Sequence, residues 1–107
     1  MALTQANDQN FDKLLQENSL VLVKYYADWC GNCKLIAPKV RRISEDESYA
    51  TVSFLDINAE ESPEARKRAG VDNLPFFAAF KNGEFVGGSA ASKIEFVQEL
   101  IQQKLLS

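Results

Sequence analysis

The stretch VKYYADWCGNCK, residues 23–34, places two cysteines three positions apart directly behind an apolar run. The run starts at SLVLVKYYA (19–27), whose β-branched and aromatic residues predict a strand covered on both faces. After the cysteines, apolar residues recur at helical spacing and predict one buried face of a helix: Leu35, Ile36, Val40 and Ile43. Pro38 lies inside this helix, where we expect a kink. The cysteines therefore lie where a buried strand meets a helix.

A second strand and a short helix follow along the chain. TVSFLDI (51–57) predicts a strand parallel to the first, because a helix connects the two. SPEARKRAG (62–70) then predicts a short helix with Ser62 as its cap, Pro63 at its first position and Gly70 just beyond its end. Together these segments form a βαβ unit followed by a helix.

Both ends of the chain also predict helices. Near the N-terminus, apolar residues at three- and four-residue spacing predict a helix from Asn7 to Glu17: Phe11, Leu14 and Leu15. The last segment, SKIEFVQELIQQKLL (92–106), opens with Ser92 and Glu95 in capping-box spacing. Its apolar residues share one face: Ile94, Val97, Leu100, Ile101 and Leu105.

The segment FFAAFKNGEFVGG (76–88) predicts an antiparallel hairpin, because two apolar runs flank Asn82-Gly83. The full order is helix, strand, helix, strand, helix, hairpin, helix. This order predicts an α/β fold with a mixed central β-sheet flanked by helices on both faces.

Length and composition limit what kind of protein this is. The 107 residues suit a single domain, 1–107, and 46% hydrophobic and 25% charged residues are ordinary for a globular chain. The net charge is −3 and the basic runs fall in helical segments, so we expect no nucleic-acid partner. No apolar run approaches the roughly 18 residues that cross a bilayer, so we expect no membrane partner. The N-terminus does not resemble a secretory signal, which predicts a cytoplasmic protein, or a plastid stromal one if a transit peptide was removed.

Several interpretations of Cys30 and Cys33 compete. A structural zinc site usually takes four Cys or His ligands, and the chain has two cysteines and no histidine, so we expect no metal. A purely structural disulfide gains little, because closing so short a loop contributes only about 2 kcal/mol. Two inert cysteines at this spacing remain an alternative. A redox pair explains more of the context, because a helix N-terminus favours a thiolate at Cys30, and Cys33, one turn further in and less exposed, can attack a mixed disulfide.

The segment ADWCGNCKLIAPKV (27–40) is similar to the active-site segment of the thioredoxin family. Trp29 precedes the first cysteine and Lys34 follows the second. VDNLPFF (71–77) occupies the place of that family's cis-proline loop, and FKNGE (80–84) that of its hairpin. The resemblance covers nearly the whole chain in the right order.

This resemblance implies the thioredoxin fold and a cis Leu74–Pro75 bond next to the cysteines. It also implies a substrate groove formed by Trp29, Leu74, Pro75 and the segment 89–91, with Gly31 and Asn32 between the cysteines. The backbone of Leu74 would pair with an extended substrate as a short added strand, which gives affinity with little sequence preference.

The chain departs from the family pattern at the dipeptide between the cysteines and in its substrate loop. Gly31-Asn32 replaces the usual Gly-Pro, and the lost proline predicts a somewhat more oxidising couple. FVGGSAASK (85–93) is shorter than its usual counterpart, which predicts different partners. LPFF (74–77) is more similar to atypical plastid and cyanobacterial thioredoxins than to the general bacterial type.

A third departure concerns a charge inside the first strand. Six positions before the first cysteine the family usually has a buried aspartate, faced by a lysine on the neighbouring strand; here that position is Lys24 and the neighbouring one is Asp56. We expect Lys24 and Asp56 to form a swapped ion pair beneath Cys33, with Asp56 or a water taking over proton transfer. The alternative is that Lys24 extends its stem along the core and keeps its ammonium in solvent.

The sequence therefore predicts a protein-disulfide oxidoreductase that reduces disulfides in target proteins. The resemblance implies no bound cofactor, since Cys30 and Cys33 carry the electrons. It also implies a thioredoxin reductase as a partner, and we expect a monomer. The alternative is a binding module that uses the fold as a scaffold and in which the cysteines are regulatory.

Overall fold

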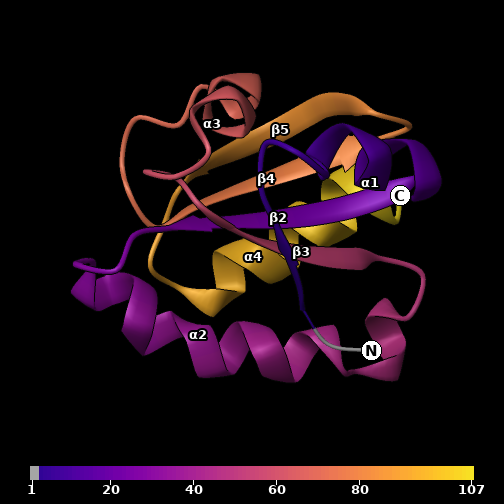
Figure 1. Ribbon diagram of the computed structural model, residues 1–107. Helices are drawn as coiled ribbons and strands as arrows, with labels where there is room; N and C mark the ends of the chain where they lie inside the picture. Colours follow the sequence, from indigo (N-terminus) through magenta and orange to yellow (C-terminus); the bar gives the residue numbers. More distant parts are fainter. Residues whose placement is uncertain (1–2) are drawn as a thin grey trace.

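The computed structural model describes residues 3–107 as one mixed sheet with helices around it (Figure 1). The strands are β1 (Thr4–Ala6), β2 (Leu20–Tyr26), β3 (Ser53–Asn58), β4 (Phe76–Lys81) and β5 (Glu84–Ala90). The helices are α1 (Phe11–Glu17), α2 (Gly31–Ser44), α3 (Pro63–Ala69) and α4 (Ile94–Leu100). A 3-10 turn spans Glu47–Tyr49, and α4 continues as a π-helical turn over Ile101–Leu105. No helix within residues 3–107 is both long and apolar enough to cross a bilayer.

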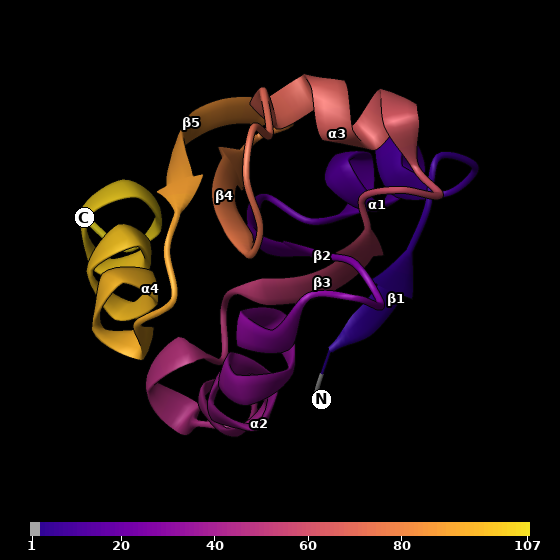
Figure 2. The same cartoon turned by 90° about the vertical axis from the view of Figure 1, so that its left-hand side faces the viewer.

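The sheet has the strand order β1-β3-β2-β4-β5. β3 pairs in parallel with β1 and β2, whereas β4 runs antiparallel to β2 and β5. Helices α1 and α3 lie on one side of the sheet, and α2 and α4 on the other (Figure 2). The predicted mixed sheet with helices on both faces is confirmed.

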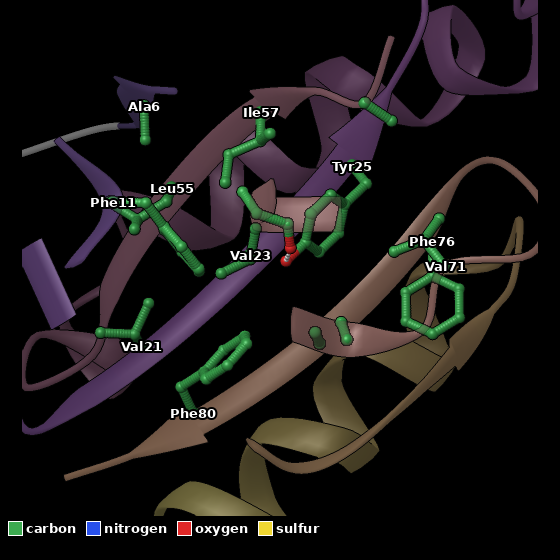
Figure 3. Packing of buried hydrophobic residues seen from close by; sticks show 14 of the residues in the cluster. Ala6, Phe11, Val21, Val23, Tyr25, Leu55, Ile57, Val71, Phe76 and Phe80 are labelled. Atoms are coloured by element: carbon green, nitrogen blue, oxygen red, sulfur yellow. Dashed lines mark hydrogen bonds between the residues drawn. The ribbon is translucent and has the colours of Figure 1, made fainter. Parts of the chain in front are cut away.

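Strand β2 is central and its alternating side chains enter two separate cores. Val21, Val23 and Tyr25 belong to the core beneath α1 and α3 (Figure 3). Leu22 belongs to the core beneath α2 and α4. Because successive side chains of a strand point to opposite faces, Lys24 shares the α2 face with Leu22. The position of Lys24 in the strand therefore sends its charge toward the helix that carries the cysteines.

The hairpin prediction is confirmed at the turn between β4 and β5. Asn82 and Gly83 have φ angles of 53° and 85°, the left-handed conformations that a two-residue type I′ turn requires. Gly88, further along β5, lies against the neighbouring strand: a Cβ there would be 2.5 Å from the carbonyl oxygen of Phe77. Only glycine fits where β5 approaches β4 this closely.

The N-terminal helix was predicted to begin too early. Its regular part begins at Phe11 rather than at about Asn7. The Asn7 side chain accepts hydrogen bonds from the N–H groups of Gln9 and Asn10 at 2.9 and 3.2 Å, the bonds that an N-cap side chain makes. A turn therefore lies between this cap and the regular helix. The prediction also missed β1, a three-residue edge strand too short to show a period.

The prediction that Leu35 lies on the buried face of α2 is also wrong. Leu35 is 75% exposed, whereas the α2 residues Ile36, Val40 and Ile43 are buried as expected. Ile36, Val40 and Ile43 already supply the spacing that fits one face of a helix. Leu35 lies one position away from this stripe, on the side facing solvent.

The cap predicted at Ser92 is also wrong. The N-cap of α4 is Lys93, and no side chain caps this helix. The Ala91 N–H donates to the carbonyl oxygen of Pro75 at 3.0 Å, which holds the chain beside that loop until after residue 91. The helix therefore starts at Ile94, and Glu95 falls one position short of closing a capping box.

Helix α3 is capped by a residue that its own sequence did not reveal. Ser62 occupies the predicted N-cap position, and Pro63 and Gly70 their expected places, but the Ser62 side chain forms no cap bond. Asp8, far away in the chain, accepts hydrogen bonds from the N–H groups of Glu64 and Ala65 at 3.1 and 2.8 Å. The cap therefore ties the N-terminal segment to α3.

Replacing this cap gives a direct stability prediction. We expect Asp8→Ala to lower the free energy of unfolding by about 1 kcal/mol, the usual effect of losing an N-cap. Asp8→Asn keeps one side-chain oxygen, which can accept one of the two bonds, so it should lose only part of this stability. Urea unfolding of the oxidised proteins measures both. Equal stability of the two variants would contradict the cap.

Candidate active site

Cys30 and Cys33 form a disulfide at the start of α2. Cys30 is the N-cap of this helix, and its sulfur accepts a hydrogen bond from the Cys33 N–H at 3.1 Å. Gly31 and Asn32 are exposed in the first turn. The cysteines are almost equally buried, at 4% and 3% exposure, so the expected lower exposure of Cys33 does not distinguish them. Their positions in the helix distinguish the two cysteines. Cys30 lies at the helix N-terminus, where free N–H groups and the helix dipole favour a thiolate.

The residues expected around the cysteines lie beside them. Leu74 packs against the small cluster of Ala27, Cys30 and Cys33. The Leu74–Pro75 bond is cis, as the resemblance implies, and Pro75 is bound by the N–H of Ala91. The 89–91 segment is therefore next to the proline loop.

Trp29 is the most exposed aromatic side chain near the disulfide, with 67% of its surface accessible. Its indole Nε1 donates a hydrogen bond to a carboxylate oxygen of Glu60 at 2.6 Å. The bond ties the exposed indole next to Cys30 to the segment that follows β3. Sequence reasoning identified Trp29 but missed Glu60, because a partner 31 positions away has no local signal.

The swapped pair is present beneath the cysteines. Lys24 of β2 and Asp56 of β3 are register partners, and Lys24 Nζ lies 3.3 Å from Asp56 Oδ1. The Lys24 side chain is 5% exposed and that of Asp56 is 20% exposed, so the ammonium is not in solvent. The alternative in which Lys24 reaches water is therefore wrong.

A cavity of about 260 Å³ connects this pair with the resolving side of the disulfide. Its lining includes Cys33 and both charged partners, together with Tyr26, Asp28 and Lys34. Because one water occupies about 30 Å³ of liquid, the cavity has room for waters between Cys33 and Asp56. The site thus joins the Cys33 sulfur and the half-buried Asp56 carboxylate along one cavity that opens to the surface.

Asp56 is an unusual carboxylate. Burial raises the pKa of Asp56 above its ordinary value, against the lowering influence of Lys24 and, more weakly, Arg41. Lys24 Nζ, 3.3 Å from Oδ1, is the charged partner of this carboxylate, and it offsets only part of the effect of burial. A carboxylate whose charge is poorly satisfied accepts a proton more readily.

Tyr26 is a site residue that the sequence did not indicate. Its ring lies 5.7 Å from Lys24 Nζ, and its hydroxyl accepts a hydrogen bond from the Gln5 amide at 3.1 Å. The ring also packs against the cysteine cluster. Tyr26 thus forms part of the wall of the cavity that the ion pair shares with Cys33. Tyrosine is common in strands, so its presence there did not indicate a role in the site.

No group of three or more possible metal ligands occurs within residues 3–107.

The family model named Thioredoxin matches residues 2–103. The chain belongs to the thioredoxin family. The thioredoxin of Bacillus subtilis is 34% identical over 106 residues, which cover 98% of this chain and 100% of that protein. Thioredoxin 1 of Plasmodium falciparum is 30% identical over 93 residues, covering 87% and 88%.

Solved structures agree with this family. Thioredoxin f from spinach chloroplast, in its short form, superposes with a TM-score of 0.87 and 28% identity, covering 94% of this chain and 91% of that one. As a thioredoxin with an intact Cys30–Cys33 pair, the protein is a thiol-disulfide oxidoreductase.

Proposed function

We propose that this thioredoxin works as a reductant of disulfides in other proteins. The observation that carries the proposal is the Cys30–Cys33 pair at the N-terminus of α2 with the exposed Trp29 ring beside it. The test is turnover of a disulfide-bonded protein with dithiothreitol as electron source. We expect reduction far faster than by dithiothreitol alone. A rate equal to that of dithiothreitol would contradict the proposal and favour a scaffold role.

The proposed reaction uses Cys30 as nucleophile and Cys33 as the resolving thiol. The Cys30 thiolate attacks one sulfur of the target disulfide, and the other sulfur leaves as a thiolate. Cys33 gives up its proton, its thiolate attacks Cys30, and the target leaves as its second thiolate. Two electrons thus pass from the dithiol to the target, and the Cys30–Cys33 disulfide is formed.

We propose that Asp56 accepts the Cys33 proton through the shared cavity. The raised pKa of Asp56 and the room for water in that cavity support this role. Asp56 must be ionised to accept a proton, so target release should slow as pH falls through its pKa. Because burial raises that pKa, the loss should begin at a higher pH than for an ordinary aspartate.

The pH dependence of single-turnover target release tests this role. We expect Asp56→Asn to slow release by about 10²-fold near neutral pH, the lower end of general acid–base effects, and to remove the acid limb. Asp28→Asn changes a carboxylate that lines the same cavity without contacting Lys24, and should retain the limb. An unchanged acid limb in Asp56→Asn would contradict the role of Asp56.

We also propose that targets lie across Trp29, Leu74 and Pro75, close to Gly31 and Asn32. The position of Leu74 against the cysteines supports a backbone contact with an extended target strand. However, the Leu74 N–H already donates to the side-chain oxygen of Asn73 at 2.9 Å. A target that pairs through this N–H must displace Asn73.

Removing this competing bond should improve target binding. We expect Asn73→Ala to raise kcat/KM for a protein disulfide by about threefold to tenfold, the value of one neutral hydrogen bond. Asn73→Asp keeps an oxygen in reach of the same N–H and serves as the matched control. Steady-state kinetics at several target concentrations measure both. A lower kcat/KM in Asn73→Ala would show that targets do not use this N–H.

A reductant must itself be reduced, so the proposal includes a thioredoxin reductase as electron donor. It also places the protein in the cytoplasm, where dithiols are kept reduced, and treats it as a monomer without nucleic-acid or membrane partners. The support for a protein target is the exposed Trp29 beside Cys30. Recycling by a purified reductase and NADPH tests the first of these points directly.

A further inference from the structure

Helix α2 differs in charge from the rest of the molecule. It contains four basic side chains and no acidic one: Lys34, Lys39, Arg41 and Arg42. The chain has 12 basic and 15 acidic side chains, so the eight basic and 15 acidic ones outside α2 give that part a net charge of −7. A strongly basic helix therefore begins at the disulfide of an otherwise acidic protein.

The four cations of α2 have no carboxylate partner within residues 3–107. All four are exposed, and none of them takes part in a salt bridge. Four of the other basic side chains do form salt bridges: Lys13, Lys24, Lys67 and Arg68. Because α2 has no acidic residue, its cations also lack the i,i+4 pairs that stabilise many helix surfaces. Their charge is thus available to a partner.

Two of these cations share one face of α2 with an exposed leucine. Leu35, Lys39 and Arg42 follow one another at spacings of four and three residues, which puts them on the face opposite the buried stripe of this helix. In Figure 1 the helix runs along the outside of the molecule. Leu35 is more exposed than Trp29, at 75% against 67%. We call Leu35, Lys39 and Arg42 the α2 strip.

The α2 strip is continuous with the redox site. Gly31, which is exposed between the two cysteines, lies one turn before Leu35 on the same face. A Cβ on Gly31 would meet no atom within 4 Å, so the surface there is open. From Leu35 to Arg42 the helix rises about 10 Å, the length of about three extended residues. A short segment next to the reactive cysteine of a target can therefore reach the whole strip.

We propose that the α2 strip is a docking surface for an acidic segment of a target protein, in which an apolar residue is followed by carboxylates close to the target's disulfide. The apolar residue contacts Leu35, and the carboxylates pair with Lys39 and Arg42. This inference rests on the proposed function and deepens it, because it names the class of disulfide that is reduced fastest. Complementary charge of this kind acts mainly on the rate of encounter.

The helix dipole explains only part of the charge on α2. Arg41 and Arg42 lie in its last turn, where cations interact favourably with the dipole. Lys39 lies before that turn, and Lys34 lies near the N-terminal end, where the dipole disfavours a cation. The acidic residues 45–47 follow the helix and repel an acidic segment, so the strip ends at Arg42.

The size and surroundings of the α2 strip favour a protein segment over an extended polyanion. The strip is about 10 Å long, which matches a short run of carboxylates. A nucleic-acid duplex or an anionic membrane extends far beyond it and would also face the rest of the molecule, whose net charge is −7. The exposed Leu35 adds an apolar contact that suits a protein side chain.

The test compares two disulfide-bonded peptides that differ only in an arm beside one cysteine. One arm is a leucine followed by glutamates and aspartates, and the other is a leucine followed by glutamines and asparagines. Trp29 fluorescence of the reduced protein gives the second-order rate. At about 0.01 M salt we expect the acidic arm to react about tenfold faster, the lower end of electrostatic steering. At about 1 M salt, where the Debye length is only about 3 Å, the two rates should converge.

Removing the two cations of the strip should remove this preference. We expect Lys39→Gln/Arg42→Gln to lower the rate ratio of the two arms from about tenfold to about twofold at low salt. The matched control Lys13→Gln/Lys67→Gln removes the same charge from exposed positions on α1 and α3, on the other side of the sheet, and should keep the ratio (Figure 2). A variant that only damages the fold slows both arms alike and leaves the ratio unchanged.

Two further variants test the direction of the contact. Lys39→Glu/Arg42→Glu should reverse the preference, so that an arm of leucine and lysines is reduced faster than the acidic arm. Leu35→Gln should slow reduction of the acidic arm by about tenfold, the lower end of the effect of burying a leucine side chain. An acidic arm that begins with glycine in place of leucine should not show this loss.

The outcomes separate this inference from the proposed function. Wild type that reduces both arms at equal rates at low salt overturns the docking surface but keeps the reductant. A ratio that Lys39→Gln/Arg42→Gln leaves unchanged, or that the control variant lowers equally, also overturns it. Equal rates for both arms together with binding to a DNA duplex or to phosphatidylserine vesicles would assign the strip to a polyanion instead. Wild type that reduces neither arm faster than dithiothreitol refutes the proposed function and this inference with it.

Discussion

Cys30→Ser is expected to lose protein-disulfide reduction by at least about 10³-fold, the scale of removing a catalytic nucleophile. The disulfide pair lies at the N-terminus of α2, and Cys30 is the cysteine whose sulfur caps that helix. A serine hydroxyl there cannot replace a thiolate, because its oxygen stays protonated near neutral pH. Turnover of a disulfide-bonded protein with dithiothreitol measures the loss.

Cys33→Ser is the matched variant and should fail in a different way. Its Cys30 still attacks the target, but no second thiol resolves the mixed disulfide, so a covalent complex should accumulate. Non-reducing electrophoresis with and without a reductant detects it. If Cys33→Ser forms no adduct while Cys30→Ser forms one, the roles of the two cysteines are reversed.

The second large effect concerns the buried pair. We expect Asp56→Asn to lower the free energy of unfolding by about 3–5 kcal/mol, because it leaves the Lys24 ammonium without a counter-ion in a site where its side chain is 5% exposed. Domains are stable by only about 5–15 kcal/mol, so this variant should be close to the limit of folding. Urea unfolding of the oxidised form measures the change.

Lys24→Met should be milder than Asp56→Asn, because Asp56 is 20% exposed and can become neutral by taking up a proton. The pKa of Asp56 is raised by burial, and without Lys24 it rises further, so its protonated form favours the folded state. The stability of Lys24→Met relative to wild type should therefore improve as pH falls through the pKa of Asp56 and worsen as pH rises. Equal destabilisation at all pH values would contradict this coupling.

The double variant Lys24→Met/Asp56→Asn controls for the loss of charge itself. Replacing a buried ion pair by neutral groups is often neutral or stabilising, so the double variant should recover most of the stability lost by Asp56→Asn. A double variant less stable than Asp56→Asn would show that Lys24 contributes packing rather than a charge that needs pairing.

The fold was predictable where a local pattern carries it. The apolar run of β2, the Asn82-Gly83 turn and the stripe of α4 each encode one element within a few neighbouring residues. The same holds for the cysteine pair, whose spacing and place before a helix indicate its chemistry. The Lys24–Asp56 pair was predicted from the resemblance to the family, which usually has an aspartate faced by a lysine at these positions, and the register of β2 and β3 places the two residues opposite each other.

Most of the features that the sequence did not predict depend on contacts between distant parts of the chain. The Asp8 cap of α3 and the Glu60 partner of Trp29 leave no trace in hydrophobic periodicity, because each joins residues that only the fold brings together. The Asn73 bond to Leu74 is local, but hydrophobic periodicity does not indicate it either. The start of α1 was predicted too early for a local reason, since a turn that Asn7 caps precedes the regular helix.

The equilibrium reduction potential of the Cys30–Cys33 pair tests the central claim most directly, with Trp29 fluorescence reporting the redox state against a defined dithiol buffer. The account predicts one reversible two-electron couple, more oxidising than the roughly −270 mV of thioredoxin because Asn32 replaces the usual proline, yet well below the roughly −180 mV of protein disulfide isomerase. A potential at or above that of the isomerase, or no reversible couple at all, would contradict a general reductant.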